Sequence, residues 1–173
     1  GDTTLHGATT LAERFHDAGY ATAGFISNVM LRSSTGLHRG FDAYDETLPT
    51  REPNRPRFFE RDAAQTTQSA IQWLRRGQDR PVFLLVHYQD PHGPYLPPQD
   101  FQGRVGAVPL RMKGQIPVLT KNQGQAGIPA YQELPGVTDP AVYAGRYAEE
   151  IMYSDFWLGQ FVEAFEAYNA ARP

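Results

Sequence analysis

One short stretch, Val82–Pro98, restricts the fold of this chain more than any other. It reads VFLLVHYQDPHGPYLPP, and its opening run, Val82–Val86, has the length and apolar content of a strand buried on both faces. The prolines and the glycine that follow cannot continue a strand, so they force an irregular loop. In open α/β sheets, ligands bind just beyond the carboxyl ends of the strands. The stretch therefore predicts a stiff loop at a place where chemistry usually occurs.

Helices alternate with strands ahead of this loop. Thr10–Glu13 has the spacing of a capping box and predicts a helix that ends near Gly19, followed by a strand over Tyr20–Ile26. A second helix is expected over Glu60–Arg76, just before the apolar run of Val82–Val86. This alternation predicts an α/β fold with a mostly parallel sheet flanked by helices.

The last third of the chain has a different character. Residues 99–138 carry scattered glycines, prolines and glutamines without helical or strand periodicity, which predicts a long irregular insert. A strong helix is expected over Pro140–Ala170. An apolar seam is predicted along it, formed by Tyr143, Tyr147, Ile151, Ser154, Leu158, Phe161, Val162 and Phe165. We expect Glu149 and Glu150 on the same helix to be solvated, as helix charges usually are.

Composition excludes several classes of function. The 173 residues suit one domain, and a net charge of −3 with a pI near 5.9 gives no electrostatic reason to bind nucleic acid or acidic membranes. No apolar run approaches the roughly 18 residues of a membrane span. The chain has no cysteine, so these residues hold no disulfide, thiolate metal site or cysteine nucleophile.

His92 is the first candidate for a functional residue. Pro91 and Pro94 restrict the backbone on both sides of it, and an imidazole can donate a hydrogen bond, transfer a proton or bind a metal. The residues alone leave open whether His92 is functional or only caps a turn. Asp90 could bind a metal, but an aspartate before proline is more often a turn initiator, and His87 is expected to be a hydrogen-bonded core histidine rather than a ligand.

Two further residues are weaker candidates. Asn28 follows the Tyr20–Ile26 strand, and parallel strands would bring it to the same sheet edge as His92, although a simple strand-end turn is the preferred explanation. Tyr95 either lines a pocket or packs against its own loop. No glycine-rich phosphate loop, zinc motif or calcium loop occurs in the sequence.

Four stretches together resemble the sulfatase family of the alkaline phosphatase superfamily. Thr10–Ala23 is similar to its "TLAE…AGY.TA" helix and strand, and Arg39–Tyr44 is similar to its "GFD.Y" turn. Phe83–Pro98 resembles the "F..VHY.DPH.PY.PP" strand and loop, and Tyr147–Gly159 resembles the "Y..EI.Y.D..LG" helix. Their order and spacing agree with the family over nearly the whole chain, except the 99–138 insert.

The resemblance assigns roles to individual residues. It implies that His92 contacts the sulfate group as a catalytic and substrate-binding residue, with Asn28 and Tyr95 as further substrate contacts. Many family members have a lysine, and a histidine two residues later, where this chain has Asn28 and Met30. This difference removes the charged part of sulfate binding at that position, while an asparagine amide still donates a hydrogen bond.

The resemblance also implies groups outside these residues. Family members form a formylglycine nucleophile from a C/S-x-P-x-R motif and hold calcium or a similar divalent cation with acidic residues near both ends of the domain. We therefore expect the chain to be the central portion of one sulfatase-like catalytic domain, with no metal ligands or cofactor of its own, and inactive alone. In full length it would hydrolyse a sulfate ester of a small molecule or glycan, and alone we expect it to form a homo-oligomer.

Two alternatives remain open at this level. The first keeps the superfamily but makes the substrate a phosphate or phosphonate ester. The second is a non-catalytic interaction module in which the His92 loop only packs.

Overall fold

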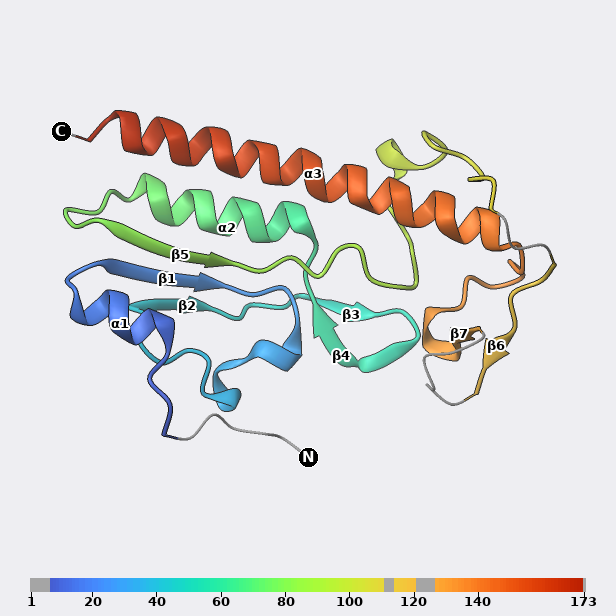
Figure 1. Cartoon of the computed structure of the whole chain (residues 1–173), viewed down its shortest axis with the longest axis horizontal. Helices are drawn as coiled ribbons and strands as arrows, with labels where there is room; N and C mark the ends of the chain where they lie inside the picture. The colour runs from blue at the N-terminus through green and yellow to red at the C-terminus, as the bar shows by residue number, and fades with distance from the viewer. Residues whose placement is uncertain (1–6, 111–113, 121–126, 173) are drawn as a thin grey trace. The chain divides into compact units, whose positions relative to one another are not determined.

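The structure is a computed structural model that describes residues 7–110, 114–120 and 127–172 (Figure 1). The chain divides into two compact units. Unit 1 comprises Gly1–Arg51, Phe58–Gln89 and Trp157–Pro173, and unit 2 comprises Glu52–Arg57 and Asp90–Phe156. Each unit is described by itself.

A parallel sheet forms the centre of unit 1. Its strands are β1 (Ala21–Phe25), β2 (Ala43–Asp45) and β5 (Val82–Val86), in the order β2-β1-β5. Both pairings are parallel, with Ala23 opposite Ala43 on one side and Leu84 on the other. The predicted α/β class with a parallel sheet is confirmed, and β1 and β5 lie where the sequence places them.

Local capping signals define both helices of unit 1. Helix α1 (Leu11–Asp17) begins with the predicted capping box, in which Thr10 Oγ1 accepts from Glu13 N and the Glu13 carboxyl accepts from Thr10 N. Helix α2 (Ala63–Arg75) has an equivalent box at Asp62. It begins three residues later than predicted because Arg55–Glu60 forms strand β4.

Helices α1 and α2 cover opposite faces of the sheet (Figure 1). The α2 face carries the core: Ala21, Ala23, Phe25, Ala70, Trp73 and Leu74, with Val82, Leu84 and Val86 packed against it. Successive strand residues point to opposite faces, so Phe83 faces α1, where it stacks on Phe15 with ring centroids 4.3 Å apart. The prediction that β5 is buried on both faces is wrong: its residues are only partly buried and Leu85 is 38% exposed, because β5 is an edge strand of the three-stranded sheet.

The Gly40–Phe41–Asp42 turn is hydrogen-bonded to β1. Thr22 N donates to Asp42 Oδ2 at 2.9 Å, Asp42 N donates to Thr22 Oγ1 at 2.9 Å, and Thr22 Oγ1 donates to the Gly40 carbonyl at 2.7 Å. Arg80 pairs with the same Asp42 carboxylate at 3.2 Å. Burial opposes the charged form of Asp42, but the Thr22 amide and Arg80 outweigh it and leave its pKa lowered.

Several short elements were not predicted. Strand β2 lies in a segment with glycines before it and prolines after it, and β3 (Thr50–Glu52) and β4 (Arg55–Glu60) form a two-stranded sheet around the turn at Pro53-Asn54. Two single-turn 3₁₀ helices, η1 (Val29–Leu31) and η2 (Ser33–Thr35), follow β1.

Unit 2 contains the insert and the first part of helix α3 (Pro140–Ala170), whose bounds match the prediction. Within residues 99–138 the structure has η3 (Gln99–Phe101), β6 (Val118–Leu119), β7 (Ile128–Pro129) and η4 (Ala130–Gln132). The irregular insert is thus interrupted by short elements, and its residues 111–113 and 121–126 lie outside the described residues.

The predicted apolar seam of α3 is buried at Tyr143, which is 4% exposed, but not along its whole length, since Leu158 and Val162 are 45% and 43% exposed. Tyr147 and Ile151 of the expected seam are each 43% exposed, whereas Glu149 and Glu150, expected to be solvated, are 2% and 4% exposed. Backbone N–H groups of the neighbouring loops bind both carboxyl groups, which makes their burial tolerable. No helix among the described residues combines the length and the hydropathy that a membrane span requires.

Two glycines with the same backbone conformation provide a test of the packing of α1. Gly19 and Gly40 both have φ of +85°, but a Cβ at Gly19 meets nothing within 4 Å, while one at Gly40 would lie 2.1 Å from Glu13 N. We predict that Gly19→Ala lowers the free energy of unfolding by about 1–2 kcal/mol, the cost of a left-handed alanine. Gly40→Ala should cost about 3–5 kcal/mol, because backbone must move as well. Urea unfolding of the two variants measures the difference, and equal losses would contradict the packing described.

Candidate functional site

The His92 loop lies in unit 2 and is anchored through its backbone. His92 N donates to Glu150 Oε2 at 3.2 Å, and Leu96 N donates to Glu150 Oε1 at 2.7 Å. The Asp90–Pro91 and Gly93–Pro94 peptide bonds are cis. The imidazole of His92 stacks on the ring of Tyr131, with centroids 6.1 Å apart and planes 22° from parallel.

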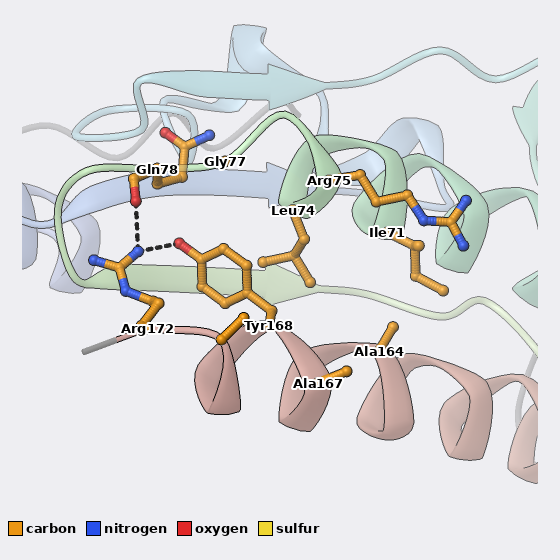
Figure 2. Close-up of a pocket in the computed structure, with 10 residues that line it drawn as sticks. Ile71, Leu74, Arg75, Gly77, Gln78, Ala164, Ala167, Tyr168 and Arg172 are labelled. Carbon is orange, nitrogen blue, oxygen red and sulfur yellow. Dashed lines mark hydrogen bonds between the residues drawn. The ribbon is translucent and has the colours of Figure 1, made fainter.

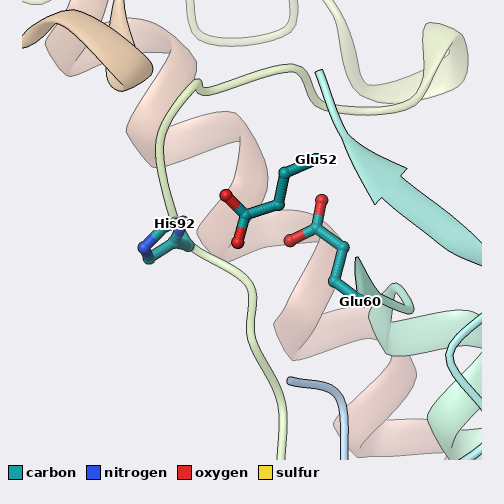
Figure 3. Close-up of side chains that lie close together, drawn as sticks. All are labelled: Glu52, Glu60 and His92. Carbon is teal, nitrogen blue, oxygen red and sulfur yellow. The ribbon is translucent and has the colours of Figure 1, made fainter. Parts of the chain in front are cut away.

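A charged pair from the β3–β4 turn lies beside this imidazole. A carboxylate oxygen of Glu52 is within 4.8 Å of a His92 ring nitrogen (Figure 3). Arg55 Nε donates to Glu52 Oε2 at 2.5 Å, and its guanidinium carbon lies 3.8 Å from the centroid of the Tyr131 ring. Unit 2 therefore surrounds His92 with one acidic, one basic and one aromatic side chain. Figure 3 also labels Glu60, which belongs to unit 1 and is not counted in this group.

Burial dominates the protonation of His92. Desolvation lowers its pKa below the ordinary 6.5, Glu52 acts in the opposite direction, and Arg55 lowers it again. The imidazole is therefore neutral at pH 7. A neutral imidazole keeps one N–H donor and one acceptor nitrogen, so it can still donate a hydrogen bond to an oxygen of a bound anion.

The Glu52–His92 pair does not fit a calcium-type cation. Calcium takes six to eight oxygen ligands, whereas this pair offers one carboxylate and one imidazole nitrogen. Arg55 already holds an oxygen of the same carboxylate, and its positive charge repels a second cation. Glu52 Oε1 is buried and has no hydrogen-bond partner among the described residues. One additional hydrogen-bond donor would satisfy this oxygen.

The other two predicted residues have separate surroundings. Tyr95 packs edge-to-face on Tyr147 at 5.4 Å, and burial followed by the nearby charge of Glu150 raises its pKa. Asn28, in unit 1, is 7% exposed, and its Oδ1 accepts from Met30 N at 2.8 Å as the cap of η1. Asn28 therefore forms the turn expected at the end of the strand. The capping bond uses only its Oδ1, so the side-chain NH₂ group can still donate to another group.

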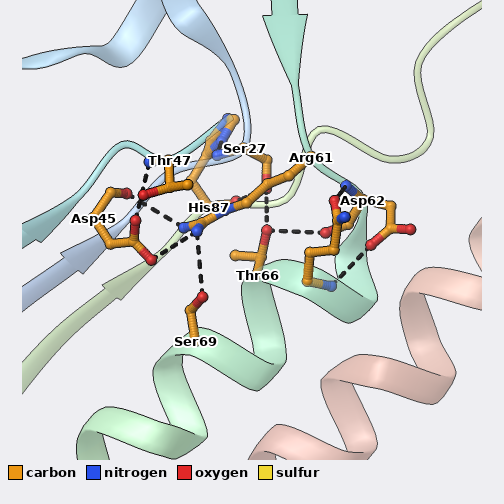
Figure 4. Close-up of polar contacts among 9 residues, drawn as sticks. Ser27, Asp45, Thr47, Arg61, Asp62, Thr66, Ser69 and His87 are labelled. Atoms are coloured by element: carbon orange, nitrogen blue, oxygen red, sulfur yellow. Dashed lines mark hydrogen bonds and ion pairs between the residues drawn. The ribbon is translucent and has the colours of Figure 1, made fainter. Parts of the chain in front are cut away.

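Polar groups at the carboxyl ends of the unit 1 strands join the sheet to α2 (Figure 4). Ser27 Oγ bonds Thr66 Oγ1 and donates to the His87 carbonyl, while Ser27 N donates to His87 Nδ1 at 3.4 Å. Arg61, only 2% exposed, donates to Asp45 Oδ2 at 2.7 Å. Most of these groups pair with one another and so help to hold α2 in place, although Arg61 Nε has no hydrogen-bond partner among the described residues. His87 is hydrogen-bonded as predicted, but it is only half-buried.

Unit 1 also contains an apolar pocket of about 430 Å³ near the C-terminal ends of α2 and α3 (Figure 2). Its walls include Ile71, Leu74, Ala164 and Ala167. The guanidinium of Arg172 donates to the Gln78 carbonyl at 2.6 Å and to the Tyr168 hydroxyl. No convergent catalytic groups line this pocket, so it is not the candidate site.

Comparison with known protein families identifies the family of this chain. The sequence matches the family model "Sulfatase" over residues 4–172. The chain belongs to the Sulfatase family. Among solved structures it is similar to a protein in the alkaline phosphatase superfamily from Vibrio parahaemolyticus, with 16% sequence identity and a TM-score of 0.50. That likeness covers 96% of this chain and 33% of the other, so this chain spans about a third of that structure's length. No curated protein is significantly similar in sequence.

The sequence gives little indication of three residues that lie beside His92 in the candidate site. Glu52, Arg55 and Tyr131 lie far from His92 in sequence, and no periodicity links them. The only local signal is the Pro53-Asn54 turn, which brings Glu52 and Arg55 together on adjacent strands. Their grouping around His92 depends on tertiary structure.

The charges around His92 predict how its titration responds to mutation. Glu52→Gln removes the charge that favours the imidazolium, so the pKa of His92 should fall further below 6.5. Arg55→Met removes an opposing charge, so the pKa should rise. NMR titration of the imidazole measures both. Arg57→Met, which removes an exposed arginine of the same strand, is the control and should leave the titration unchanged. A fall on Arg55→Met would contradict the arrangement.

Proposed function

We propose that residues 1–173 are the central portion of a sulfatase-like catalytic domain whose full-length enzyme hydrolyses sulfate esters of a small molecule or glycan. The observation that carries the proposal is His92, held on an anchored loop with a lowered pKa in a chain of the Sulfatase family. The same family match makes a non-catalytic packing module the weaker explanation.

His92 is proposed to donate its N–H to a sulfate or leaving-group oxygen. A sulfate ester carries a negative charge, and a hydrogen bond to it strengthens as charge develops on the oxygens in the transition state. Stacking on Tyr131 restricts the ring, so the donor direction is fixed before substrate binds. A neutral donor also releases the anionic product more readily than an imidazolium would.

The nucleophile and the cation are proposed to come from residues outside 1–173. A formylglycine would supply the attacking oxygen, and calcium or a similar cation would stabilise developing charge. The sequence contains no cysteine and no C/S-x-P-x-R motif, and the Glu52–His92 pair does not fit calcium. Residues 1–173 alone are therefore proposed to be inactive.

Removing the His92 imidazole tests the function directly. In the full-length protein, we predict that His92→Ala lowers kcat/KM for an aryl sulfate about 100-fold, the effect of one transition-state donor. His38→Ala is the matched control, because that histidine follows η2 and no catalytic role is proposed for it. Unchanged turnover with His92→Ala would refute the assignment. Parallel assays with an aryl phosphate and a phosphonate ester distinguish the superfamily alternative, since a preference for either would replace the sulfate proposal.

Asn28 and Tyr95 are proposed as secondary substrate contacts. Asn28→Asp keeps the oxygen that caps η1 but replaces the amide donor by a negatively charged group. We predict about a tenfold rise in KM for the sulfate ester, while the urea midpoint stays within error because the cap survives. Tyr95→Phe removes only the hydroxyl and should raise KM about threefold if that group touches substrate. Unchanged KM in both variants would reduce these residues to packing roles.

We also propose that residues 1–173 associate with a second copy. Tyr147 and Ile151, one turn apart on α3, are each 43% exposed, and Leu158 and Val162 are 45% and 43% exposed. Burying such apolar side chains favours association. Sedimentation velocity should detect a dimer or larger oligomer that Ile151→Lys weakens, whereas a monomer at all concentrations would contradict the proposal.

A further inference from the structure

The buried carboxyl group of Glu150 holds both ends of the turn that carries His92. Its side chain comes from α3 and is 4% exposed, and each of its oxygens accepts one backbone N–H, from His92 and from Leu96. The two amides flank Gly93-Pro94-Tyr95, so one side chain fixes the entry and the exit of the turn.

The loop needs such an acceptor because of its sequence. Pro91, Pro94, Pro97 and Pro98 have no N–H, and they interrupt the regular pairing through which the remaining amides would be satisfied. A hydrogen bond to a charged acceptor is stronger than one between neutral groups, and two of them offset the burial of the carboxylate. The two hydrogen bonds therefore satisfy amides of the loop and also stabilise the buried carboxylate.

We propose that Glu150 is a positioning residue for catalysis, which sets the direction of the His92 imidazole through the backbone of residues 92–96. This inference rests on the proposed role of His92 as a donor to the sulfate ester. The ring of His92 follows its own backbone, which Glu150 contacts at 3.2 Å, and an added Cβ at Gly93 would lie 2.8 Å from the side chain of Gln132. The loop consequently has little room for a second conformation.

The neighbouring residue provides a matched control. Glu149 is 2% exposed, and its Oε1 accepts from Val105 N at 3.2 Å and from Gly106 N at 3.4 Å. Glu149 is therefore a second buried carboxyl group on α3 that accepts two backbone amides, but these amides belong to a different loop from that of His92. A general loss of stability should result from replacing either residue, whereas a loss of catalysis should result only from replacing Glu150.

The experiment compares Glu150→Gln with Glu149→Gln in the full-length protein. A glutamine accepts one amide through its oxygen, but its NH₂ group faces the other donor. We expect Glu150→Gln to lower kcat/KM for the aryl sulfate about 10- to 100-fold, mostly in kcat, because a small displacement of a catalytic donor has effects of this size. Glu149→Gln should stay within twofold of the parent, and Glu150→Asp, which keeps the carboxylate, should recover part of the loss.

A double variant separates positioning from simple destabilisation. If Glu150 acts through His92, then Glu150→Gln should have no further effect on kcat/KM in the His92→Ala background. A full additional loss there, or a kcat/KM within twofold of the parent for Glu150→Gln alone, would overturn the inference. Activity that is lost with His92→Ala but kept with Glu150→Gln would refute only the positioning role. Unchanged activity with His92→Ala would refute the proposed function itself.

Amide hydrogen exchange tests the two hydrogen bonds to Glu150 without any variant or activity assay. The amides of His92 and Leu96 should exchange more slowly than that of Tyr95 in the same loop. Rapid exchange at both would overturn the inference even if Glu150→Gln fails to fold.

Discussion

Unpaired backbone N–H groups are the constraint on which the arrangement around His92 depends. A loop with several prolines loses donors at those positions and cannot pair the rest in a regular ladder. In unit 2, buried carboxyl groups accept some of these N–H groups. Glu150 accepts amides of the His92 loop, and Glu149 accepts those of Val105 and Gly106. The stiffness expected of the loop thus comes from a helix distant in sequence as well as from its own prolines.

Elements with local signals could be predicted from the sequence. The capping box at Thr10, the apolar run Val82–Val86 and the start of α3 after Asp139 are encoded within a few residues, and the structure confirms each. The end of β1 and the helix stop at Gly19 follow equally local rules. These elements were sufficient for the α/β class.

Elements that depend on partners could not be predicted. Strand β2 has only three residues, and it is a strand because β1 pairs with it. The periodicity of α3 indicates an apolar seam, yet Tyr147 is exposed and Glu150 is buried, since the loops of unit 2 supply donors to the carboxylate side of that helix. The same dependence hides Glu52 and Arg55, whose relation to His92 is purely tertiary.

The environment of His92 suits a neutral donor better than a proton-transfer group. Burial and Arg55 lower its pKa, and the carboxylate of Glu52, which raises it, is itself held by Arg55 at 2.5 Å. A general acid that must be protonated at pH 7 would need the opposite balance, with an uncompensated carboxylate beside the ring. A donor to a sulfate oxygen needs only one N–H in a fixed direction. Stacking on Tyr131 and the hydrogen bond from His92 N to Glu150 both favour one direction. The electrostatics and the anchoring of the loop therefore favour the same role for this histidine.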